Sequence, residues 1–565
     1  MTVQTKADDS KLDESSTVIP FEIIALFLLL LTISYLARLF LGDTKLSLIL
    51  VYSTFLFRFL LGGIVVIISK YVLGLRTYGM FGVTILVLSM IAIGPFWGTL
   101  MFINIFILGY IARYLIQSYN LAVGFRVGIL MTFVICYISL LELIGESYRI
   151  SFLSATILVP ILITPWYIDR YSNEIEEKDH YRAFIRLVTT ILLSLAAYVI
   201  MSLDFLIEFI VLNPETWILI LAIYFYLGRS QKYTYMDKLR FKQLFSIKDD
   251  PLTLLIRNRD YIARYNAKIL FPLINKFDMK ERFEKWQVPT PELYAVIESE
   301  KDVNFLMNRL CTEDQFSNGF VLKPSKSFGG KGIFVITERT LDKMFIIDGK
   351  KWHPETLEAE IRKILGGEYL TSQTSTDNDV VLIEERISTE ASFSKIGLGL
   401  PDVRVIVFRG IPVMAMARLP THESGGKANL KQGAIGAAIR LSDGVITNAI
   451  WKGHSIKSHP DTRNIIKGFR YNKWKEILAV ACLAQKSSGL GYTGVDVVLE
   501  DDGRILVLEV NKRPGLEIQN INQQSLLGRF QYIEGKDLDS MNHSPLKSAS
   551  LGMELSQSVW CNANN

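Results

Sequence analysis

The chain changes its hydrophobic pattern near residue 228. Up to that point, apolar runs of about 20 residues follow one another, and this is the length that crosses the hydrocarbon core of a bilayer. Beyond it, apolar runs shorten to strand length and alternate with polar or amphipathic helical stretches. The candidate membrane spans are 19–41, 46–68, 78–96, 98–117, 122–144, 151–168, 183–203 and 206–228.

Two breaks leave the number of spans at seven or eight. Gly94-Pro95 interrupts a nearly continuous apolar run from Met80 to Ile116, and a proline there kinks or ends a helix. Asn213-Pro214 shortens the last candidate in the same way. Residues 1–18 form a polar tail, and the run that starts at Ile19 is too long for the apolar region of a signal peptide.

Basic residues are concentrated in every second loop between the predicted spans. With eight spans and an inner N-terminus, the outer loops hold mainly Lys45 and Arg149. The inner loops hold Lys70, Arg76, Arg113, Arg126, Arg170, Lys178, Arg182, Arg186, Arg229, Lys232, Lys238 and Arg240. Under the positive-inside rule this predicts a multi-pass integral protein of a bacterial inner membrane or plasma membrane, with the C-terminal half in the cytoplasm.

Ionisable residues inside the apolar runs are costly and point to function unless they reach a helix end. Glu146 and Glu208 lie close to the ends of their runs and are expected to reach the membrane surface. Arg58 is central in its run. It is expected either to pair with Glu142 or to bind an anionic group of a substrate.

The C-terminal half reads as an α+β module. Apolar, β-branched runs predict strands, and helices are expected at 355–366 and 472–488. The predicted strands lie at 320–324, 332–336, 380–384, 403–408, 495–499 and 505–510. The module is assigned to 235–530, and the polar segment 531–565 is expected to be a loosely ordered tail.

Composition agrees with two different halves. Charged residues make up roughly 13% of residues 1–230 and roughly 26% of the rest. The net charge of +5 is modest and gives no case for nucleic-acid binding. The four cysteines and six histidines show no CxxC or HExxH spacing, so a zinc enzyme is not expected.

A glycine-rich loop follows the first predicted strand of the module. Residues 323–332 read KPSKSFGGKG, and Gly329, Gly330, Lys331 and Gly332 lead directly into the next strand. Glycines let backbone amides approach phosphate oxygens, and lysines neutralise the phosphate charge. The loop fits neither the Walker pattern nor the dinucleotide fingerprint. A hairpin turn with exposed lysines is the alternative.

Acidic residues interrupt two apolar runs near the end of the module. Asp496 lies in one run, and Glu509 and Asn511 lie in the next, with an acidic turn between them. The pattern predicts a hairpin in which Glu509 and Asn511 share one face and Asp496 meets them. Two carboxylates and an amide oxygen are hard ligands suited to Mg²⁺.

Two arginines on neighbouring predicted strands, Arg404 and Arg418, could hold a phosphate or carboxylate in bidentate fashion. A surface salt bridge is the alternative for each. Asn429, in the glycine-containing stretch after Arg418, is a weak signal by itself.

Taken in order, these motifs resemble the ATP-grasp superfamily of carboxylate–amine ligases, and within it the branch of α-L-glutamate ligases that modify a ribosomal protein. The resemblance covers about 235–530. It rests on Lys276 before the WQVPTP stretch, Lys323 and its glycine loop, the LIEERI strand, Asp402-Val403-Arg404, Arg418, Asn429, and the Asp496–Glu509–Asn511 set followed by Pro514-Gly515.

The resemblance implies a fold and roles. The whole chain would be a polytopic α-helical membrane bundle of seven or eight helices followed by an ATP-grasp domain. Lys276 and Lys323 would bind the α- and β-phosphates of ATP, and the glycine loop would close over the β- and γ-phosphates. Glu384, Glu385 and Ile387 would frame the adenine, and Asn429 would be a further cofactor-binding residue. Asp496, Glu509 and Asn511 would hold two Mg²⁺ ions. Arg404 and Arg418 would face the transferred phosphoryl group and the acyl-phosphate.

Two functions from different classes follow. The first is a membrane-anchored ligase that joins a carboxylate to an amine through an acyl-phosphate, with small-molecule, peptide or lipid-linked substrates. The second is a nucleotide-binding sensor or transporter in which an idle ATP-grasp domain gates the helices. Phosphoryl transfer depends on positioning and charge neutralisation, so the lack of a Ser/His/Asp constellation is expected for the ligase.

Overall fold

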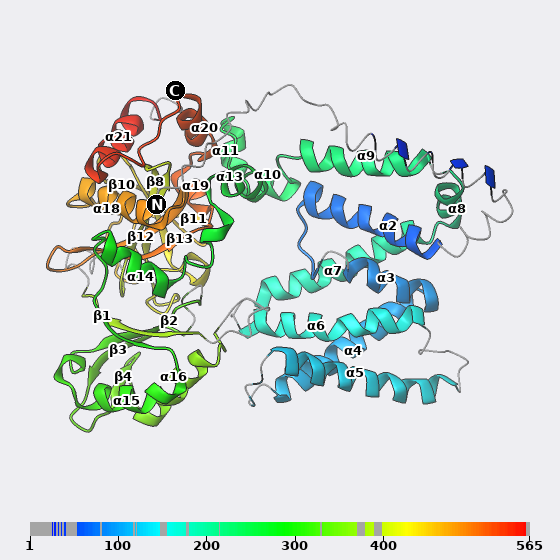
Figure 1. Ribbon diagram of the computed structural model, residues 1–565, viewed down its shortest axis with the longest axis horizontal. Coiled ribbons are helices and arrows are strands. Elements are labelled where there is room, and N and C mark those ends of the chain that lie inside the picture. Colours follow the sequence, from blue (N-terminus) through cyan, green and yellow to red (C-terminus); the bar gives the residue numbers. More distant parts are fainter. Residues whose placement is uncertain are drawn as a thin grey trace. The chain divides into compact units, whose positions relative to one another are not determined.

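The computed structural model describes residues 54–560 apart from short gaps, together with isolated positions between 25 and 40. The gaps are 80–81, 117–118, 120, 122, 147–154, 177–179, 214, 328–329, 331, 370–378 and 389–397. The chain divides into two compact units, Met1–Met236 and Asp237–Asn565 (Figure 1).

The first unit is helical. Its described helices are α2 (Thr54–Ile67), α3 (Gly82–Ile93), α4 (Pro95–Ile116), α5 (Val123–Glu146), α6 (Ala155–Glu176), α7 (His180–Met201), α8 (Asp204–Leu212) and α9 (Glu215–Ser230). They lie within or across the predicted spans from 46 onward, whereas the predicted span 19–41 and the polar tail 1–18 fall almost wholly outside the described residues.

Three described helical stretches are long and apolar enough to cross a membrane: Leu56–Leu73, Pro95–Ile116 and His180–Met201. The pair Asp204–Val211 and Thr216–Gly228 bends by 103° at its break and adds a fourth if it is one span. Gly82–Ile93 and Gly124–Leu140 are shorter apolar helices. The predicted breaks at Gly94-Pro95 and Asn213-Pro214 therefore coincide with helix ends, while the number of spans remains a prediction.

Small residues let these helices approach closely. A Cβ atom on Gly98 of α4 would lie 2.8 Å from the Met90 backbone of α3. Gly82 of α3 accommodates the Tyr167 side chain of α6, which is almost fully buried. Close approach at small residues is typical of helix packing in membranes, where the hydrophobic effect between helices is weak.

Charged residues of this unit pair within it. Arg58 donates to Asp204 Oδ1 (2.5 Å) and to the Met201 carbonyl (3.0 Å). The expected pairing of Arg58 with Glu142 is therefore wrong, because the start of α2 packs beside the start of α8. Deeper in the unit, the buried Asp169 accepts hydrogen bonds from Arg113 and Arg126.

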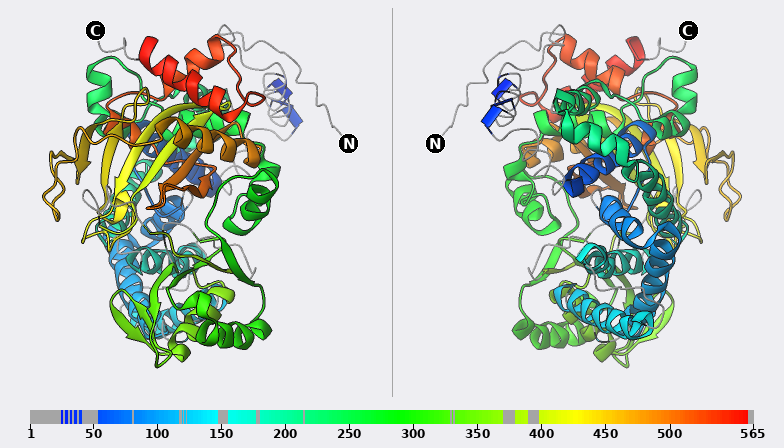
Figure 2. Two further views of the ribbon diagram at one scale, coloured as in Figure 1. Left: turned by 90° about the vertical axis from the view of Figure 1, so that its left-hand side faces the viewer. Right: turned by 90° about the vertical axis from the view of Figure 1, so that its right-hand side faces the viewer.

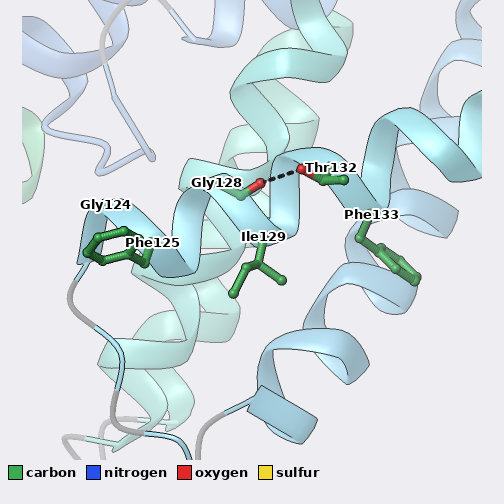
Figure 3. Close-up of a pocket in the computed structure, with 6 residues that line it drawn as sticks. All are labelled: Gly124, Phe125, Gly128, Ile129, Thr132 and Phe133. Atoms are coloured by element: carbon green, nitrogen blue, oxygen red, sulfur yellow. Dashed lines mark hydrogen bonds between the residues drawn. The ribbon is translucent and has the colours of Figure 1, made fainter.

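One side of α5 forms an open apolar depression, shown in Figure 3. It is lined by Gly124, Phe125, Gly128, Ile129, Thr132 and Phe133. The Thr132 hydroxyl donates to the Gly128 carbonyl (3.0 Å), which satisfies the hydroxyl within the helix. A Cβ atom on Gly124 or Gly128 would meet no atom within 4 Å, so these glycines make no close contact in this structure.

The second unit contains two antiparallel sheets. The smaller has the order β1-β6-β2-β3-β4-β5 and the larger the order β11-β10-β9-β8-β7-β12-β13. The strands of the smaller sheet are β1 (Leu293–Ile297), β2 (Phe320–Pro324), β3 (Phe334–Arg339), β4 (Phe345–Ile347), β5 (Lys350–Trp352) and β6 (Val381–Glu385). Those of the larger sheet are β7 (Asp402–Phe408), β8 (Ile411–Leu419), β9 (Ile435–Ile439), β10 (Ile446–Trp451), β11 (His454–Ser455), β12 (Tyr492–Leu499) and β13 (Ile505–Asn511).

Helices pack on both sheets. The smaller sheet carries α15 (Val303–Thr312) and α16 (Pro354–Leu365), whose apolar side chains join its core. The larger sheet carries α18 (Trp474–Ser488), α19 (Glu517–Asn522) and α21 (Pro545–Ser558). The remaining helices of this unit include α10 (Tyr235–Arg240), α11 (Lys242–Ser246), α12 (Leu254–Ile256), α13 (Ala263–Tyr265), α14 (Lys276–Lys285) and α20 (Leu527–Gly535).

Most sequence predictions for this unit are confirmed, with one clear exception. The helices expected at 355–366 and 472–488 correspond to α16 and α18, and every predicted strand is present. The expectation of a loosely ordered tail from 531 is wrong. Helix α21, the red helix in Figure 2, packs on α18 and β8, and Gly552 lies too close to Pro412 for any larger residue.

Candidate active site

Helix α14 connects the two sheets. Asn275 caps its first turn by accepting from the Phe277 and Asp278 amides (both 3.0 Å), and the Ser325 hydroxyl after β2 donates to the same Asn275 oxygen (3.0 Å). At the other end, Arg282 donates to the Ser488 carbonyl of α18 (3.2 Å). The helix therefore holds the end of β2 in a defined position relative to the larger sheet.

Lysines from α14 and β2 converge on one buried glutamate. Lys280 and Lys323 both form ion pairs with Glu384 of β6, at 3.1 Å for Lys280 Nζ to Glu384 Oε1. All three side chains are less than 10% exposed. Burial lowers the pKa of Lys280 to about 8, and the Glu384 carboxylate only partly opposes this. The cluster has one more positive charge than negative while Lys280 is protonated, so it favours an anion.

The glycine loop begins beside this cluster. Lys276 Nζ donates to the Ser327 carbonyl (2.7 Å), and Gly330 and Gly332 both have positive φ, at 78° and 66°. The Lys427 ammonium reaches the Gly330 carbonyl (3.3 Å) from the loop after β8. The predicted loop residues Gly329 and Lys331 lie outside the described residues.

Gly332 predicts a specific effect of substitution. A Cβ atom there would lie 2.9 Å from Tyr369 Cγ and 3.1 Å from Pro324 Cγ. Gly332→Ala is therefore expected to displace the glycine loop and weaken binding of ATP by about 10-fold or more, as misplaced positioning groups do. Calorimetric titration with ATP measures the effect.

Gly349, at the turn between β4 and β5, offers a matched control. It also has positive φ (72°), but a Cβ atom there would meet nothing within 4 Å. Gly349→Ala carries the same backbone strain without the clash, and ATP affinity should remain unchanged. Equal losses of affinity in the two variants would contradict a positioning role for Gly332.

Arginines and aspartates form a polar row across the larger sheet. Arg404 donates from Nε and Nη2 to the two oxygens of Asp496 (2.7 and 2.6 Å). Arg418 donates in the same bidentate way to Asp402 and also reaches Asp496 Oδ2 (2.7 Å). The register explains the row, since Arg404 is paired with Asp496 across β7 and β12, and Asp402 with Arg418 across β7 and β8.

The two buried aspartates differ in their electrostatic environment. Burial would raise the pKa of Asp496, but the guanidinium groups of Arg404 and Arg418 outweigh it and hold the pKa below its usual range. At Asp402, burial dominates and raises the pKa, with only Arg418 close enough for a bidentate bond. Asp496 therefore remains ionised, as a metal ligand must be.

Glu509 and Asn511 complete the predicted set on β13. Glu509 is the cross-strand partner of Asp496, and its carboxylate lies 4.0 Å from Arg404 Nη2 with 37% of the side chain exposed. Asn511 Nδ2 donates to Asp496 Oδ2 (3.3 Å). The hairpin and the shared face predicted from the sequence are therefore confirmed.

The donor chemistry of this set fits Mg²⁺. Within the described residues, no three His, Cys, Asp or Glu side chains form a metal-binding group. The predicted set has two carboxylates, and Mg²⁺ is commonly held by one or two carboxylates together with water and phosphate oxygens. Asp496 Oδ1 accepts one hydrogen bond, from Arg404 Nε, whereas Oδ2 accepts three. A carboxylate oxygen has two lone pairs, so Oδ1 can still ligate a cation beside the exposed Glu509 carboxylate.

An electrostatic interaction links the lysine cluster to this row. Burial lowers the pKa of Lys276, and the Glu509 carboxylate opposes this more strongly than any other neighbour. Lys276 also feels the positive charge of Lys323. The phosphate-binding lysines and the acidic strand end predicted from distant parts of the sequence thus lie in one electrostatic environment.

Three other predicted residues lie apart from these contacts. Glu385 faces away from Glu384, as successive strand residues do, and accepts from Arg504 (2.6 Å). Ile387 follows the end of β6 and is half-buried. Asn429 accepts from the Lys431 amide (3.1 Å) and starts a short turn.

Lys280 is the one residue of the cluster that the sequence reading missed. Its signal was present, because Lys276 and Lys280 are four residues apart and therefore share one face of α14. A lysine pair at this spacing on an N-capped helix beside a glycine loop indicates a cationic helix face directed at one ligand.

Comparison with known families agrees with the division into two parts. Residues 256–535 match the family described as sugar-transfer associated ATP-grasp. Residues 50–245 match the family described as 7 transmembrane helices usually fused to an inactive transglutaminase. The chain thus has an N-terminal region of apolar helices and a C-terminal α+β domain with the ATP-grasp fold. A search of curated proteins found no match.

Solved structures of ATP-grasp ligases are similar to about half of the chain. D-cycloserine synthetase DcsG is 15% identical over 46% of this chain and 69% of its own, with a TM-score of 0.28. The ligase PsnB complexed with minimal precursor is 16% identical over 48% and 64%, with a TM-score of 0.27. D-alanyl-alanine synthetase A from Vibrio cholerae is 11% identical over 50% and 65%, with a TM-score of 0.28. This chain thus spans less than two thirds of the latter two.

Proposed function

We propose that the protein is a membrane-anchored, ATP-dependent ligase that joins a carboxylate to an amine through an acyl-phosphate. The observation that carries the proposal is the joint presence of a net-positive lysine cluster and an ionised aspartate beside an exposed glutamate. The first suits ATP phosphates and the second suits Mg²⁺, and phosphoryl transfer needs both.

Each group of residues has a distinct role in this proposal. Lys276, Lys280 and Lys323 neutralise the phosphates, and the glycine loop positions them with its backbone amides. Asp496, Glu509 and Asn511 would hold the two magnesium ions that the resemblance implies. When bound, Mg²⁺ would neutralise the charge that develops on the phosphates during transfer. The polypeptide around Glu384 to Ile387 holds the adenine, and Asn429 remains a nucleotide contact on the loop side.

The arginine row orients the acyl group. A carboxylate oxygen of the substrate attacks the γ-phosphorus, the bond to the β,γ-bridging oxygen breaks, and ADP leaves. The bonds of Arg404 and Arg418 to the aspartates use Nε and Nη2, so their Nη1 groups are the donors proposed to bind the acyl-phosphate that forms. The amine nitrogen then attacks the acyl carbon, phosphate departs, and the amine loses a proton to solvent. No protein nucleophile is needed.

The membrane region anchors this domain on the side where ATP is present. The distribution of Lys and Arg along the sequence supports a multi-pass topology with the domain in the cytoplasm. Arg113 and Arg126, which the sequence assigned to an inner loop, lie in α4 and α5 and pair with Asp169, so the remaining basic residues carry this support. A glutamate or another amino acid, free or in a peptide or lipid-linked chain, is the substrate class that the sequence resemblance favours.

Stimulated ADP release tests the proposal. The full-length protein, purified in detergent, is incubated with MgATP and with pools of carboxylic acids and amines, separately and together. ADP release should require both kinds of substrate. In the alternative function, a nucleotide-gated sensor or transporter, ATP would bind with no pool stimulating ADP release, and that result would reject the ligase.

A further inference from the structure

A short basic segment follows the last apolar helix of the chain. Residues 229–248 contain six Lys or Arg and a single acid, Asp237, and Asp249 and Asp250 follow directly. The segment includes α10 and α11, which are labelled in Figure 1. Charge is therefore concentrated at one point that directly follows a candidate membrane span.

Buried and exposed side chains alternate along 238–248. Phe241, between α10 and α11, and Leu244 of α11 are fully buried and anchor the segment in the second unit. Leu239 and Ile247 are about half exposed, at 53% and 51%. The lysines beside them are also exposed: Lys238, Lys242 and Lys248. Arg240 is different, since it pairs with Glu517 (3.0 Å) and serves the fold.

This mixture of exposed side chains fits one kind of partner. Exposed lysines alone could bind any polyanion. Because exposed leucine and isoleucine lie between them, the segment favours a partner with an anionic surface and an apolar layer just beneath it. An anionic bilayer offers both within the reach of a lysine side chain. The chain itself brings the segment to such a surface, because it starts where α9 ends.

We infer that the exposed side chains of the segment 238–248 dock on anionic lipid headgroups. Lys238, Lys242 and Lys248 contact the headgroups, and Leu239 and Ile247 enter the interface. The inference rests on the proposed membrane location of the chain and is independent of ligase activity. Its consequence is that lipid charge controls how firmly the second unit is held at the membrane surface.

Hydrogen–deuterium exchange on the full chain tests this. The protein is reconstituted in nanodiscs of phosphatidylcholine alone or with phosphatidylglycerol. Exchange of amides 235–248 is expected to slow by about threefold or more in the anionic discs, because the segment is shielded there. The triple variant Lys238→Gln, Lys242→Gln, Lys248→Gln should lose this difference.

A second triple variant controls for net charge. Lys343, Lys350 and Lys351 are exposed residues of the smaller sheet, and replacing them with glutamine changes the charge equally. This control should keep the lipid-dependent protection of 235–248. Equal exchange in both kinds of nanodisc, or equal loss of protection in both variants, would overturn the docking surface. ADP release in detergent should be unaffected in both, which separates this test from that of the proposed function.

Discussion

Replacing Glu509 with glutamine is expected to lower ATP turnover by about 100-fold or more while leaving the fold intact. A metal ion contributes several kcal/mol to the transition state of phosphoryl transfer, and each 1.4 kcal/mol is a factor of about ten in rate. The Glu509 side chain is 37% exposed and its nearest ion-pair partner, Arg404, is 4.0 Å away. Its removal should therefore cost little stability. Steady-state ADP release and thermal unfolding measure the two effects separately.

Glu554→Gln is a suitable control for Glu509→Gln. Glu554 is an exposed carboxylate on α21, far from the polar row in the sequence and in none of its contacts. This variant should keep both turnover and unfolding midpoint. Turnover of Glu509→Gln within threefold of the unmodified protein would show that this carboxylate is not a ligand of catalytic magnesium.

The second large effect is expected from Arg418→Met. Arg418 donates to both Asp402 and Asp496, and all three side chains are 13% exposed or less. The substitution leaves Asp402 without its bidentate partner and Asp496 with one guanidinium instead of two. Breaking a buried ion pair from one side costs about 3–5 kcal/mol, so the unfolding midpoint of the second unit should fall by several degrees.

Lowering the pH should partly relieve the destabilisation in Arg418→Met. The carboxylates left behind are buried, so their pKa values rise in the folded state and exceed those in the unfolded chain. The folded state then takes up protons more readily, and the deficit relative to the unmodified protein should shrink as the pH falls from 7 toward 5. Scanning fluorimetry at several pH values measures this change.

Arg440→Met serves as the comparison for Arg418→Met. Arg440 also forms a bidentate ion pair, with Asp443 in the turn between β9 and β10, but it is 49% exposed. An exposed pair of this kind contributes little to stability. A similar decrease of the unfolding midpoint in both variants would contradict a role for burial in the polar row. A decrease in Arg418→Met that becomes larger at low pH would contradict it as well.

The local elements of the site are predictable from the sequence because short-range signals define them. The hairpin of β12 and β13 is marked by two apolar runs around an acidic turn with Gly503. The short connection sets the register near the turn, where Leu499 pairs with Ile505. The pairing of Asp496 with Glu509 depends in addition on a bulge between Asp496 and Val497, which the sequence pattern does not show. The glycine loop after Lys323 is equally local.

The pairing of Arg418 with Asp402 was not predicted, because it depends on the register between β7 and β8. The two-residue turn at Arg409 and Gly410, both with positive φ (49° and 78°), pairs Phe408 with Ile411 and Val407 with Pro412. A bulge between Ile406 and Val407 then shifts the alignment by one residue, so that Asp402 pairs with Arg418. In the sequence, an arginine and a glycine between two apolar runs indicate a turn without specifying how the strands align. The sequence therefore predicted Arg404 and Arg418 as separate ligands of an anion, whereas in the structure they form a row with Asp402 and Asp496.

Contacts between distant segments were the hardest to predict. Helix α21 covers β8 although about 130 residues separate them, and its polar composition concealed a buried stripe at Ser548, Ala549, Gly552 and Leu555. Small residues on such a stripe permit close packing but have little hydrophobic signal. Lys280 was also hard to predict, because its role depends on its burial against Glu384, a residue far away in the sequence.

Hydroxylamine trapping detects the acyl-phosphate that this site is proposed to form. Hydroxylamine replaces the unknown amine and converts an acyl-phosphate to a stable hydroxamate. With full-length protein, MgATP and a pool of amino acids and peptides, we expect hydroxamate to form together with an equal amount of ADP, and neither to form with Glu509→Gln. Tight ATP binding without hydroxamate from any carboxylate, and with equal behaviour of Glu509→Gln, would contradict the account.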